Sequence, residues 1–438
     1  MLKATFDAVA ALDYPDFEVL VILNNTPEEE YWRPVESHCA RLGERFKFIF
    51  LPKVAGFKAG AMNAALPFMA KDAEIIAVID ADYVVHRDWL KDLVPHFADP
   101  KVGFIQAPQD HRDGGESLLK RMMKWEYDGF FDIGMVQRNE DNAIVAHGTM
   151  LLIRRAAFEQ VGGWATDTIV EDSELGLRLL EAGYSAHYTN TRYGWGILPD
   201  TYKAFKTQRH RWAYGAVQIF RKHRLHMLPG MKTLSQDQKF HYLTGWFYWM
   251  SEAVGMVMAV LSLACVPVVL FVGLALPPVL TVPLVAAFII NVLHNFLLYH
   301  ARVKAGVRDT VGAAIATMSL QLTIARAVYD GFITDNLPFR RTEKGGGAGK
   351  RNSTSAARAE TVFGLLLLFS AGIIRIRNAH EELNLDLFSL TLLIQAIPFL
   401  AATVMRGIEK SQNFLLFRQP QGAVSVASGA AEGVALRG

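Results

Sequence analysis

The distribution of long apolar runs constrains the fold of this chain more than any other feature, because nearly all of them follow Trp246. Four such runs occur, near 247–276, 280–300, 361–376 and 386–405. As helices, the first two and the last are long enough to cross a hydrocarbon core of roughly 30 Å. The third is short, and Arg375 and Arg377 can extend from its end to the interface. We therefore expect four membrane crossings behind a globular first half.

The charged loops between these runs predict the orientation of the chain in a membrane. Loop 337–360 holds six basic residues against two acidic ones, whereas the connection 377–386 is acidic. The positive-inside rule then places the basic loops and the globular half in the cytoplasm. Segment 311–333 is amphipathic and is expected to lie at the interface. If it crossed, the basic loops 301–309 and 337–360 would face opposite sides.

Composition excludes several classes of function. The net charge of +2 over 438 residues gives no electrostatic reason to expect a nucleic-acid partner. Two cysteines, Cys39 and Cys265, support neither a disulfide framework nor a cysteine-based metal site. The first residues show no signal-peptide pattern.

The first half alternates strand-like and helix-like stretches. Three apolar runs, at 17–23, 46–51 and 75–79, are typical of buried strands, and helical patterns at 29–42 and 59–70 lie between them. This alternation predicts an α/β domain with a parallel sheet. Ligands bind beyond the carboxyl ends of strands in such sheets, so the residues after Ile79 are candidates for a site.

Two carboxylate pairs are candidates for chemistry. Asp80 and Asp82 follow the third run, where they can hold a divalent cation that neutralises a diphosphate. A turn with a helix cap explains them equally well. Glu171 and Asp172 begin a helical pattern, where a carboxylate can cap the helix or serve as a general base. Taken alone, this pair is better explained as a cap.

A basic and aromatic helical stretch at 203–224 carries the sequence QRHRW at 208–212. It is either an amphipathic helix on the membrane face or the cover of an active site. Arginine binds a diphosphate in bidentate fashion, and a tryptophan face stacks on a sugar ring. Two further candidates are weaker. Lys58 stands at a helix start that suits phosphate, although an exposed lysine is the default, and His147 is more often structural than a ligand.

The order of these motifs resembles that of processive family-2 glycosyltransferases, which include cellulose, curdlan, chitin and hyaluronan synthases. The resemblance covers about residues 5–410 and rests on KAGAMN at 58–63, DAD at 80–82, ED at 171–172 and QRHRW at 208–212. A further segment, FRRTEKG at 339–345, resembles the family's gating loop through Phe339, Thr342 and Lys344. A disordered basic linker is the alternative for that segment.

The resemblance implies an α/β GT-A (Rossmann-like) catalytic domain followed by an α-helical membrane domain. The catalytic domain covers 1–240, with the amphipathic interfacial helix at 203–224. The membrane domain covers 241–410 and contains the four crossings, the interfacial segment 311–333 and the gating-like loop 337–347. Residues 411–438 form a tail.

On the donor side, the resemblance implies that Lys58 and Asp80 contact the nucleotide sugar. Asp82 binds the metal, Mg²⁺ or Mn²⁺, and Gln208 and Arg211 steady the departing diphosphate.

On the acceptor side, the resemblance implies that Asp172 deprotonates the attacking hydroxyl in a single inverting displacement. Trp212 stacks on the terminal acceptor sugar. Glu171 and His147 lie on the acceptor side, where the role of His147 is binding at most.

Two departures from the family pattern stand near the start of the chain. The family's first strand, with a Pro-x-Tyr-Asn-Glu-like sequence, is missing, and Leu23-Asn24-Asn25 stands where the next strand normally ends in aspartate. Loss of a central strand leaves sheet edges unpaired. These departures favour a fragment, a mis-started frame or one part of a split enzyme.

The wider motif contexts look most like bacterial β-1,3-glucan or cyclic-glucan synthases. That likeness implies UDP-glucose as the donor, a growing glucan chain as the acceptor, and room for accessory export subunits. It also implies a bacterial inner membrane with the catalytic domain in the cytoplasm. Two alternatives remain open: a non-processive transferase acting on a lipid carrier, and an inactive membrane subunit.

Overall fold

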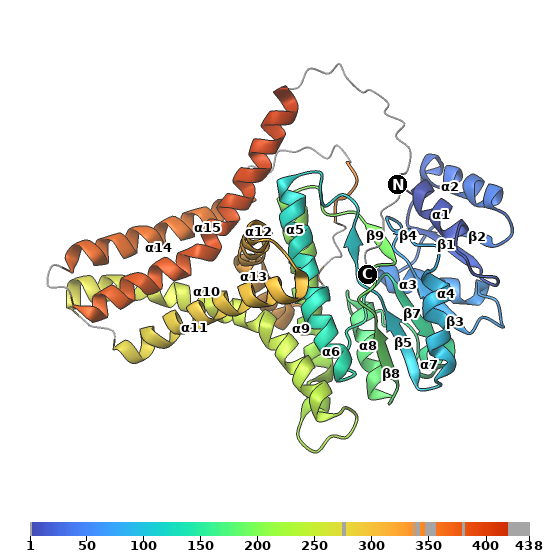
Figure 1. The fold of residues 1–438 in the computed structure, drawn as a ribbon, viewed down its shortest axis with the longest axis horizontal. Coiled ribbons are helices and arrows are strands. Elements are labelled where there is room, and N and C mark those ends of the chain that lie inside the picture. Colours follow the sequence, from blue (N-terminus) through green and yellow to red (C-terminus); the bar gives the residue numbers. More distant parts are fainter. Residues whose placement is uncertain are drawn as a thin grey trace.

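The computed structural model describes residues 2–273, 277–335, 337, 342–346, 356–378 and 382–418. Its first half is an α/β unit, and its second half is a set of long helices that extends away from it (Figure 1). The gating-loop prediction for Phe339 falls outside the described residues, whereas Thr342 and Lys344 fall inside them.

The strands form three separate sheets, and the largest mixes parallel and antiparallel pairs. This sheet has the order β3-β7-β5-β8, from β3 (Ile75–Val78), β7 (Leu151–Arg154), β5 (Val102–Gln106) and β8 (Ser185–Tyr188). Strand β7 runs antiparallel to both of its neighbours, while β5 and β8 are parallel. The expectation of a parallel sheet is therefore wrong for this part of the domain. Local sequence patterns predict where a strand lies but not its direction in the sheet. The direction of β7 depends on the long connection that precedes it.

Two smaller sheets flank the large one. Strands β1 (Val19–Asn24) and β2 (Phe46–Leu51) pair in parallel, as expected. Among the described strands, β1 pairs only with β2, and β3 pairs only with β7. The second edge of β1 and the second edge of β3 therefore have no neighbouring strand in the described part of the chain. The third sheet contains β4 (Val84–Val85), β9 (Gly194–Gly196) and β6 (Asp110–His111).

The alternation of side chains along β5 and β7 explains why both faces of the large sheet are covered. Phe104 on β5 and Ile153 on β7 belong to one buried cluster, which extends toward the membrane half. Their neighbours Ile105 and Leu152 belong to a second cluster, which packs under the N-terminal helices. Since successive strand residues point to opposite faces and these four are apolar, the sheet requires a layer of helices on each side.

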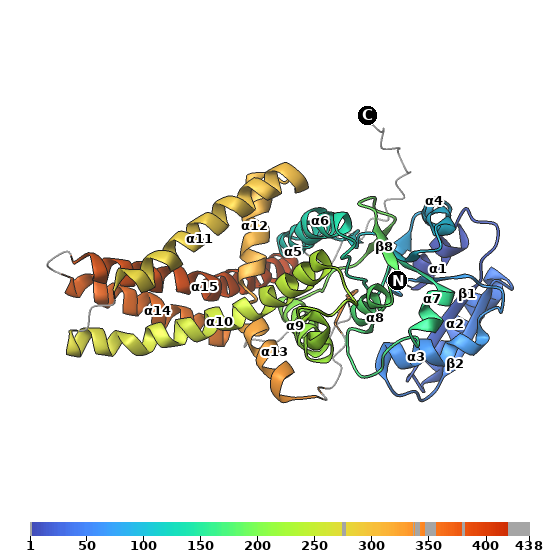
Figure 2. The same ribbon diagram turned by 90° about the horizontal axis from the view of Figure 1, so that it is seen from below.

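Helices cover the sheets on both faces (Figures 1 and 2). The covering helices are α1 (Leu2–Ala10), α2 (Glu29–Leu42), α3 (Phe57–Ala65), α4 (Trp89–Leu93), α7 (Arg155–Gln160) and α8 (Glu171–Glu181). The bounds of α2 are those predicted from sequence. Helix α8 begins without a side-chain cap, because Val170 occupies its N-cap position, so the capping explanation for Asp172 is wrong.

Two further helical segments lie between the sheets and the long helices. The first comprises α5 (Leu118–Gly129), a π-helical turn at Phe130–Met135 and α6 (Val136–Glu140). The second is α9 (Tyr202–His223), whose start is fixed by the Thr201 hydroxyl accepting a hydrogen bond from the Ala204 amide. Helix α9 coincides with the predicted stretch 203–224 to within one or two residues.

Four long helices run alongside one another in both views: α10 (Gln236–Val272), α11 (Pro278–Leu298), α14 (Arg358–Arg377) and α15 (Leu383–Arg418) (Figures 1 and 2). Helices α12 (Val307–Met318) and α13 (Gln321–Ile333) lie across them. By length and hydropathy, five helical segments among the described residues are candidate membrane spans: the four long helices and, in addition, the segment 307–333. The interfacial position of that segment stays a prediction, and its orientation across the other helices agrees with it.

Polar contacts join the two halves of the molecule. The α9 residue Tyr202 donates a hydrogen bond from its hydroxyl to the Ser319 carbonyl, and Lys206 forms an ion pair with Glu360 on α14. Arg138 on α6 donates to the His241 carbonyl on α10. The first turns of α10 thus pack on the α/β half before the helix continues into the apolar region.

The small sheet supports the residues after β3 through one close contact. A Cβ on Gly196 of β9 would lie 2.3 Å from Cε2 of Tyr83, which is fully buried directly after Asp82. We expect Gly196→Ala to lower the melting temperature, because overpacking of this kind costs about 1–3 kcal/mol. Gly115→Ala is the matched control, since a Cβ there meets nothing within 4 Å. Equal melting temperatures for the two purified variants would contradict this account.

Candidate active site

The predicted site residues come together around one cavity of about 1690 Å³. Every described residue predicted for the site lines it: Lys58, Asp80, Asp82, His147, Glu171, Asp172, Gln208, Arg211, Trp212, Thr342 and Lys344. They come from the end of β3, the starts of α3 and α8, the middle of α9 and the segment 342–346. The sequence order of the motifs thus corresponds to one place in space.

The Lys58 ammonium lies at the centre of the acidic part of the cavity. Its Nζ is 2.6 Å from Oδ1 of Asp80 and donates to the Gly148 carbonyl at 2.6 Å. Burial opposes its charge, but Asp80, Glu171 and Asp172 together raise the pKa of Lys58 above its usual value. Lys58 is therefore a partly buried cation that balances several carboxylates, not an exposed lysine.

Gly148 leaves the space in which this cluster forms. A Cβ at that position would lie 3.0 Å from both the Lys58 Nζ and the Asp172 Oδ2. A larger residue would therefore push the lysine and the carboxylate apart.

The carboxyl groups of Glu171 and Asp172 resist ionisation. Burial, followed by the charge of Asp172, raises the pKa of Glu171 to about 7. Burial also raises the pKa of Asp172, while the Lys58 ammonium and the Ser173 amide act in the opposite direction. The Ser173 amide donates to Oδ1 of Asp172 at 2.7 Å. A carboxylate with a raised pKa that faces a cavity suits a general base near neutral pH.

Asp82 is buried and holds a cation from a distant part of the chain. Its Oδ2 lies 2.9 Å from the Lys344 ammonium and accepts a hydrogen bond from the Ile197 amide at 3.3 Å. The segment carrying Lys344 is fixed further by the Gly346 amide, which donates to Asp200. Asp80 and Asp82 form no helix cap in the structure, since the next helix begins at Trp89.

The oxygen atoms of Asp80 and Asp82 suit a divalent cation. Carboxylates are the ligands that Mg²⁺ and Mn²⁺ prefer, and both side chains line the same cavity. The position of the Lys344 ammonium shows that positive charge is accommodated at Asp82. The residues therefore fit a metal that binds a diphosphate.

Helix α9 presents its QRHRW sequence to the cavity through a buried aromatic and cationic stack. Arg209 lies over the rings of Trp212 and Tyr127 at 4.2 and 4.3 Å, and it forms an ion pair with Glu126. The Tyr127 hydroxyl donates to Oε1 of Gln208 at 2.8 Å. This stack holds Gln208 and Trp212 at the cavity wall.

Sequence reasoning missed the three residues of this stack that support the motif: Glu126, Tyr127 and Arg209. The first two belong to α5, and nothing in the local pattern separates them from an ordinary amphipathic helix. Arg209 was visible inside the motif, but only the structure shows that it points into the protein.

His147 lies at the cavity wall as a neutral ring. Its centroid is 5.4 and 5.3 Å from those of Phe130 and Phe131, and burial lowers its pKa to about 4. Its backbone amide donates to Gln106. The Nδ1 atom has no hydrogen-bond partner among the described residues. Its position permits contact with a molecule in the cavity, and its surroundings exclude a charged role at neutral pH.

The cavity continues from the acidic cluster into the membrane half. Beyond Trp212 its walls come from the long helices, through Trp249 and Glu252 on α10 and Phe288, Asn291 and Asn295 on α11. Polar amides and aromatic rings thus line its far end. The same cavity thus has walls from the acidic cluster and from the candidate membrane spans.

Comparison with known proteins identifies the family. The profile described as "Glycosyl transferase family group 2" matches residues 75–299, just over half of the chain. The chain belongs to this family. The matched region contains Asp80, Asp82, Asp172 and the QRHRW sequence, and it extends through α11. The prediction that the chain belongs to the family-2 glycosyltransferases is confirmed.

Curated relatives include plant enzymes. The chain is 30% identical over 272 residues to a probable glucomannan 4-beta-mannosyltransferase of Oryza sativa subsp. japonica. The aligned region covers 60% of this chain and 46% of that protein. A second such rice protein is 29% identical over 227 residues, covering 50% of this chain and 43% of its own. The chain thus spans about half the length of the curated relatives it matches. These relatives do not confirm the predicted likeness to β-glucan synthases.

A solved structure shows the fold. The mannosyltransferase PcManGT from Pyrobaculum calidifontis, in complex with GDP-Man and Mn²⁺, aligns with a TM-score of 0.53 and 18% identity. The alignment covers 76% of this chain and 83% of that one. The predicted GT-A fold followed by a helical membrane region is confirmed, with mixed rather than parallel sheets.

The raised pKa of Glu171 predicts a pH-dependent stability. A buried carboxyl group whose pKa is raised to about 7 costs folding free energy once it ionises, so the penalty grows as the pH rises from 5 to 8. Glu171→Gln removes this penalty. Over that interval the free energy of unfolding of the variant should rise relative to wild type, by at most ~3 kcal/mol, and its melting temperature should rise accordingly. Glu44→Gln, on an exposed loop, is the control. A pH-independent difference for Glu171→Gln would contradict the assignment.

Proposed function

We propose that this chain is an inverting hexosyltransferase that extends a β-linked polysaccharide from a nucleotide-sugar donor and passes the product between its membrane helices. The observation that carries this proposal is the continuity of one cavity. Its near end contains Lys58, Asp80 and Asp172, and its far end is lined by α10 and α11. A transferase that released a short product would not require a path between candidate membrane spans.

Asp172 is the proposed general base. Its carboxylate takes the proton of the acceptor hydroxyl while the hydroxyl oxygen attacks the anomeric carbon of the donor. The bond from that carbon to the diphosphate breaks in the same step, and the diphosphate departs with the electron pair. Burial of Asp172 supports this role, because a raised pKa makes the carboxylate a stronger base.

The departing diphosphate requires positive charge within the cavity. Arg211 lines the cavity, and its charge acts on Asp172, which places it near the reacting groups. Lys58 supplies an ammonium beside Asp80. Asp82 is the proposed ligand of Mg²⁺ or Mn²⁺, which when bound neutralises the diphosphate as a Lewis acid.

The acceptor sugar is proposed to stack on Trp212. That ring is held edge-to-face against Tyr127 at 5.6 Å and covered on one side by Arg209. A rigid ring positions a sugar at low entropic cost. Glu171 and His147, which line the same cavity, are proposed to contact the acceptor as well, while Gln208 is proposed to act with Arg211 on the diphosphate.

Two donors are candidates. The motif contexts HGTMLLIRRAAFEQVGGW and LPFRRTEKG resemble β-glucan synthases, which favours UDP-glucose. The names of the plant relatives, and the GDP-Man bound by PcManGT, favour GDP-mannose and a mannan product.

Location in a bacterial inner membrane with a cytoplasmic catalytic half completes the proposal. The five candidate spans support a membrane location, and the basic loops support the orientation. A lipid-carrier transferase and an inactive subunit are the competing functions. The assembled set of charged residues argues against inactivity, since a scaffold does not require a partly buried Lys58 among three carboxylates.

Incorporation of labelled sugar tests the reaction and the donor together. Membranes carrying the chain should polymerise sugar from UDP-glucose, with GDP-mannose assayed in parallel. Asp172→Asn should lower the rate by about 10²–10⁴-fold, because it removes the general base at nearly unchanged shape. Equal rates for wild type and Asp172→Asn would contradict the proposal. Digestion by a glucanase or a mannanase identifies the product, and a single-sugar lipid product would favour the non-processive alternative.

The contact between Lys344 and Asp82 predicts competition with the metal. Both cations use the same carboxylate. In the absence of donor, the Lys344→Met variant should therefore bind Mn²⁺ more tightly than wild type. The expected gain in affinity is at least about fivefold, because the metal no longer has to displace a hydrogen bond worth ~1 kcal/mol. Free Mn²⁺ measured by electron paramagnetic resonance gives the affinity. Asp82→Asn should abolish the binding.

Lys91→Met is the matched control for this experiment, because Lys91 pairs with Asp13 on the surface. Unchanged Mn²⁺ affinity in Lys344→Met, with loss of binding in Asp82→Asn, would show that the lysine does not compete for the metal.

A further inference from the structure

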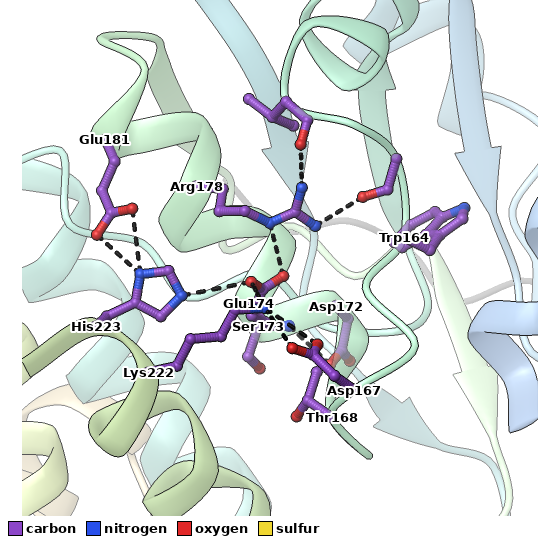
Figure 3. Close-up of polar contacts among 12 residues, drawn as sticks. Trp164, Asp167, Thr168, Asp172, Ser173, Glu174, Arg178, Glu181, Lys222 and His223 are labelled. Carbon is purple, nitrogen blue, oxygen red and sulfur yellow. Dashed lines mark hydrogen bonds and ion pairs between the residues drawn. The ribbon is translucent and has the colours of Figure 1, made fainter. Parts of the chain in front are cut away.

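Three side chains that can bind a transition metal meet outside the active-site cavity. Glu181 ends helix α8, His223 ends helix α9, and His226 lies in the 3₁₀ turn Arg224–Met227 that follows. One ligand atom from each lies within 4.8 Å of the other two. Figure 3 shows Glu181 and His223 facing each other across the two helices, with Glu174 on the other side of the imidazole ring.

We propose that Glu181, His223 and His226 form a binding site for a divalent transition metal such as Zn²⁺, which ties the end of α8 to the end of α9. Nothing in the proposed sugar transfer uses these residues, and they do not line the cavity. The site is therefore separate from the oxygen-ligand site at Asp82.

The distances fit a four-coordinate ion. Oε1 of Glu181 lies 3.0 Å from Nδ1 of His223 and 2.6 Å from Nδ1 of His226. Zinc binds nitrogen and oxygen ligands at roughly 2.0–2.2 Å in a tetrahedron, which places neighbouring ligand atoms about 3.4 Å apart. Small rotations of side chains thus bring the three atoms to the required spacing, and water takes the fourth position.

The types of ligand decide which metal fits. Two imidazoles and one carboxylate suit Zn²⁺, Co²⁺ or Ni²⁺, whereas Mg²⁺ and Ca²⁺ prefer oxygen alone. The site thus discriminates between metals by its chemistry. The cation expected at Asp82 does not compete well for it.

An outer carboxylate orients His223 for this role. Nε2 of His223 lies 3.4 Å from Oε1 of Glu174, which is fully buried and paired with Arg178 and Lys222 (Figure 3). A histidine bound to metal commonly donates its second N–H to such a carboxylate, which fixes the ring and the tautomer. Here the contact with Glu174 leaves Nδ1 to face Glu181 and the metal.

The site is buried on one side and open on the other. The side chains of His223 and Glu181 are 4% and 10% exposed, whereas that of His226 is 39% exposed. An ion can enter past His226 without unfolding of α8 or α9. For the same reason, His226 can be replaced with little effect on packing.

Cobalt binding tests the site on the full chain in detergent, freed of any affinity tag and treated with a chelator. Co²⁺ in a tetrahedral nitrogen and oxygen site gives an intense visible absorption. Wild type should bind one equivalent with this spectrum, and Zn²⁺ should displace it and raise the melting temperature. His226→Ala should weaken binding by at least about tenfold, since even loss of an outer partner has that effect.

Two controls separate this site from other metal binding. Asp82→Asn should leave the cobalt spectrum unchanged, because that residue belongs to the active site. His86→Ala replaces an exposed histidine that pairs with Asp88 and should also change nothing. An identical cobalt titration for wild type and His226→Ala, or loss of the spectrum in Asp82→Asn, would overturn the proposal. In either case the three residues form hydrogen bonds only.

Discussion

The position of one partly buried ammonium group, that of Lys58, determines how the catalytic half is assembled. Lys58 lies among the carboxyl groups of Asp80, Glu171 and Asp172, which come from the end of β3 and the start of α8. Three acids so close together repel one another, and burial increases the cost of their charges. The ammonium offsets that cost, and the missing side chain of Gly148 gives it room. The contacts with these acids raise the pKa of Lys58, while burial raises the pKa values of Glu171 and Asp172. The packing that assembles the cluster therefore also sets its reactivity.

A second cation performs the corresponding task on the opposite wall. Arg209 is almost fully buried between Tyr127 and Trp212 and is paired with Glu126. An arginine in this position must be satisfied by stacking and by an ion pair, because an unpaired buried charge is strongly destabilising. Helix α9 is thereby fixed against α5. Gln208, directly before Arg209, and Arg211, two residues after it, both line the cavity.

The sequence patterns predicted the positions of helices and strands better than they predicted how the strands pair. Helix α2 and strand β2 have the predicted bounds, because their periodicity and flanking residues are local signals. The antiparallel direction of β7 depends on contacts between distant segments, and no local pattern encodes it. The residues predicted for the site were chosen through the order of motifs rather than through any single motif, and the described ones line one cavity. Tyr127 and Glu126 were missed because their role arises only where α5 meets α9.

The two acidic positions after β3 differ in what balances them, and this difference bears on how a donor enters. Asp80 is paired with Lys58 from the neighbouring helix α3, a contact within the α/β half. Asp82 is paired with Lys344, which lies 262 residues away, in the segment that follows α13. That segment is held by two hydrogen bonds with Asp200, one from the Gly346 amide and one to the Glu343 carbonyl. The charge of Asp80 is thus balanced within the α/β half, whereas the charge of Asp82 is balanced by a segment that follows the helices α12 and α13. In the proposed reaction, a divalent cation at Asp82 would have to share this carboxylate with Lys344 or displace the ammonium from it.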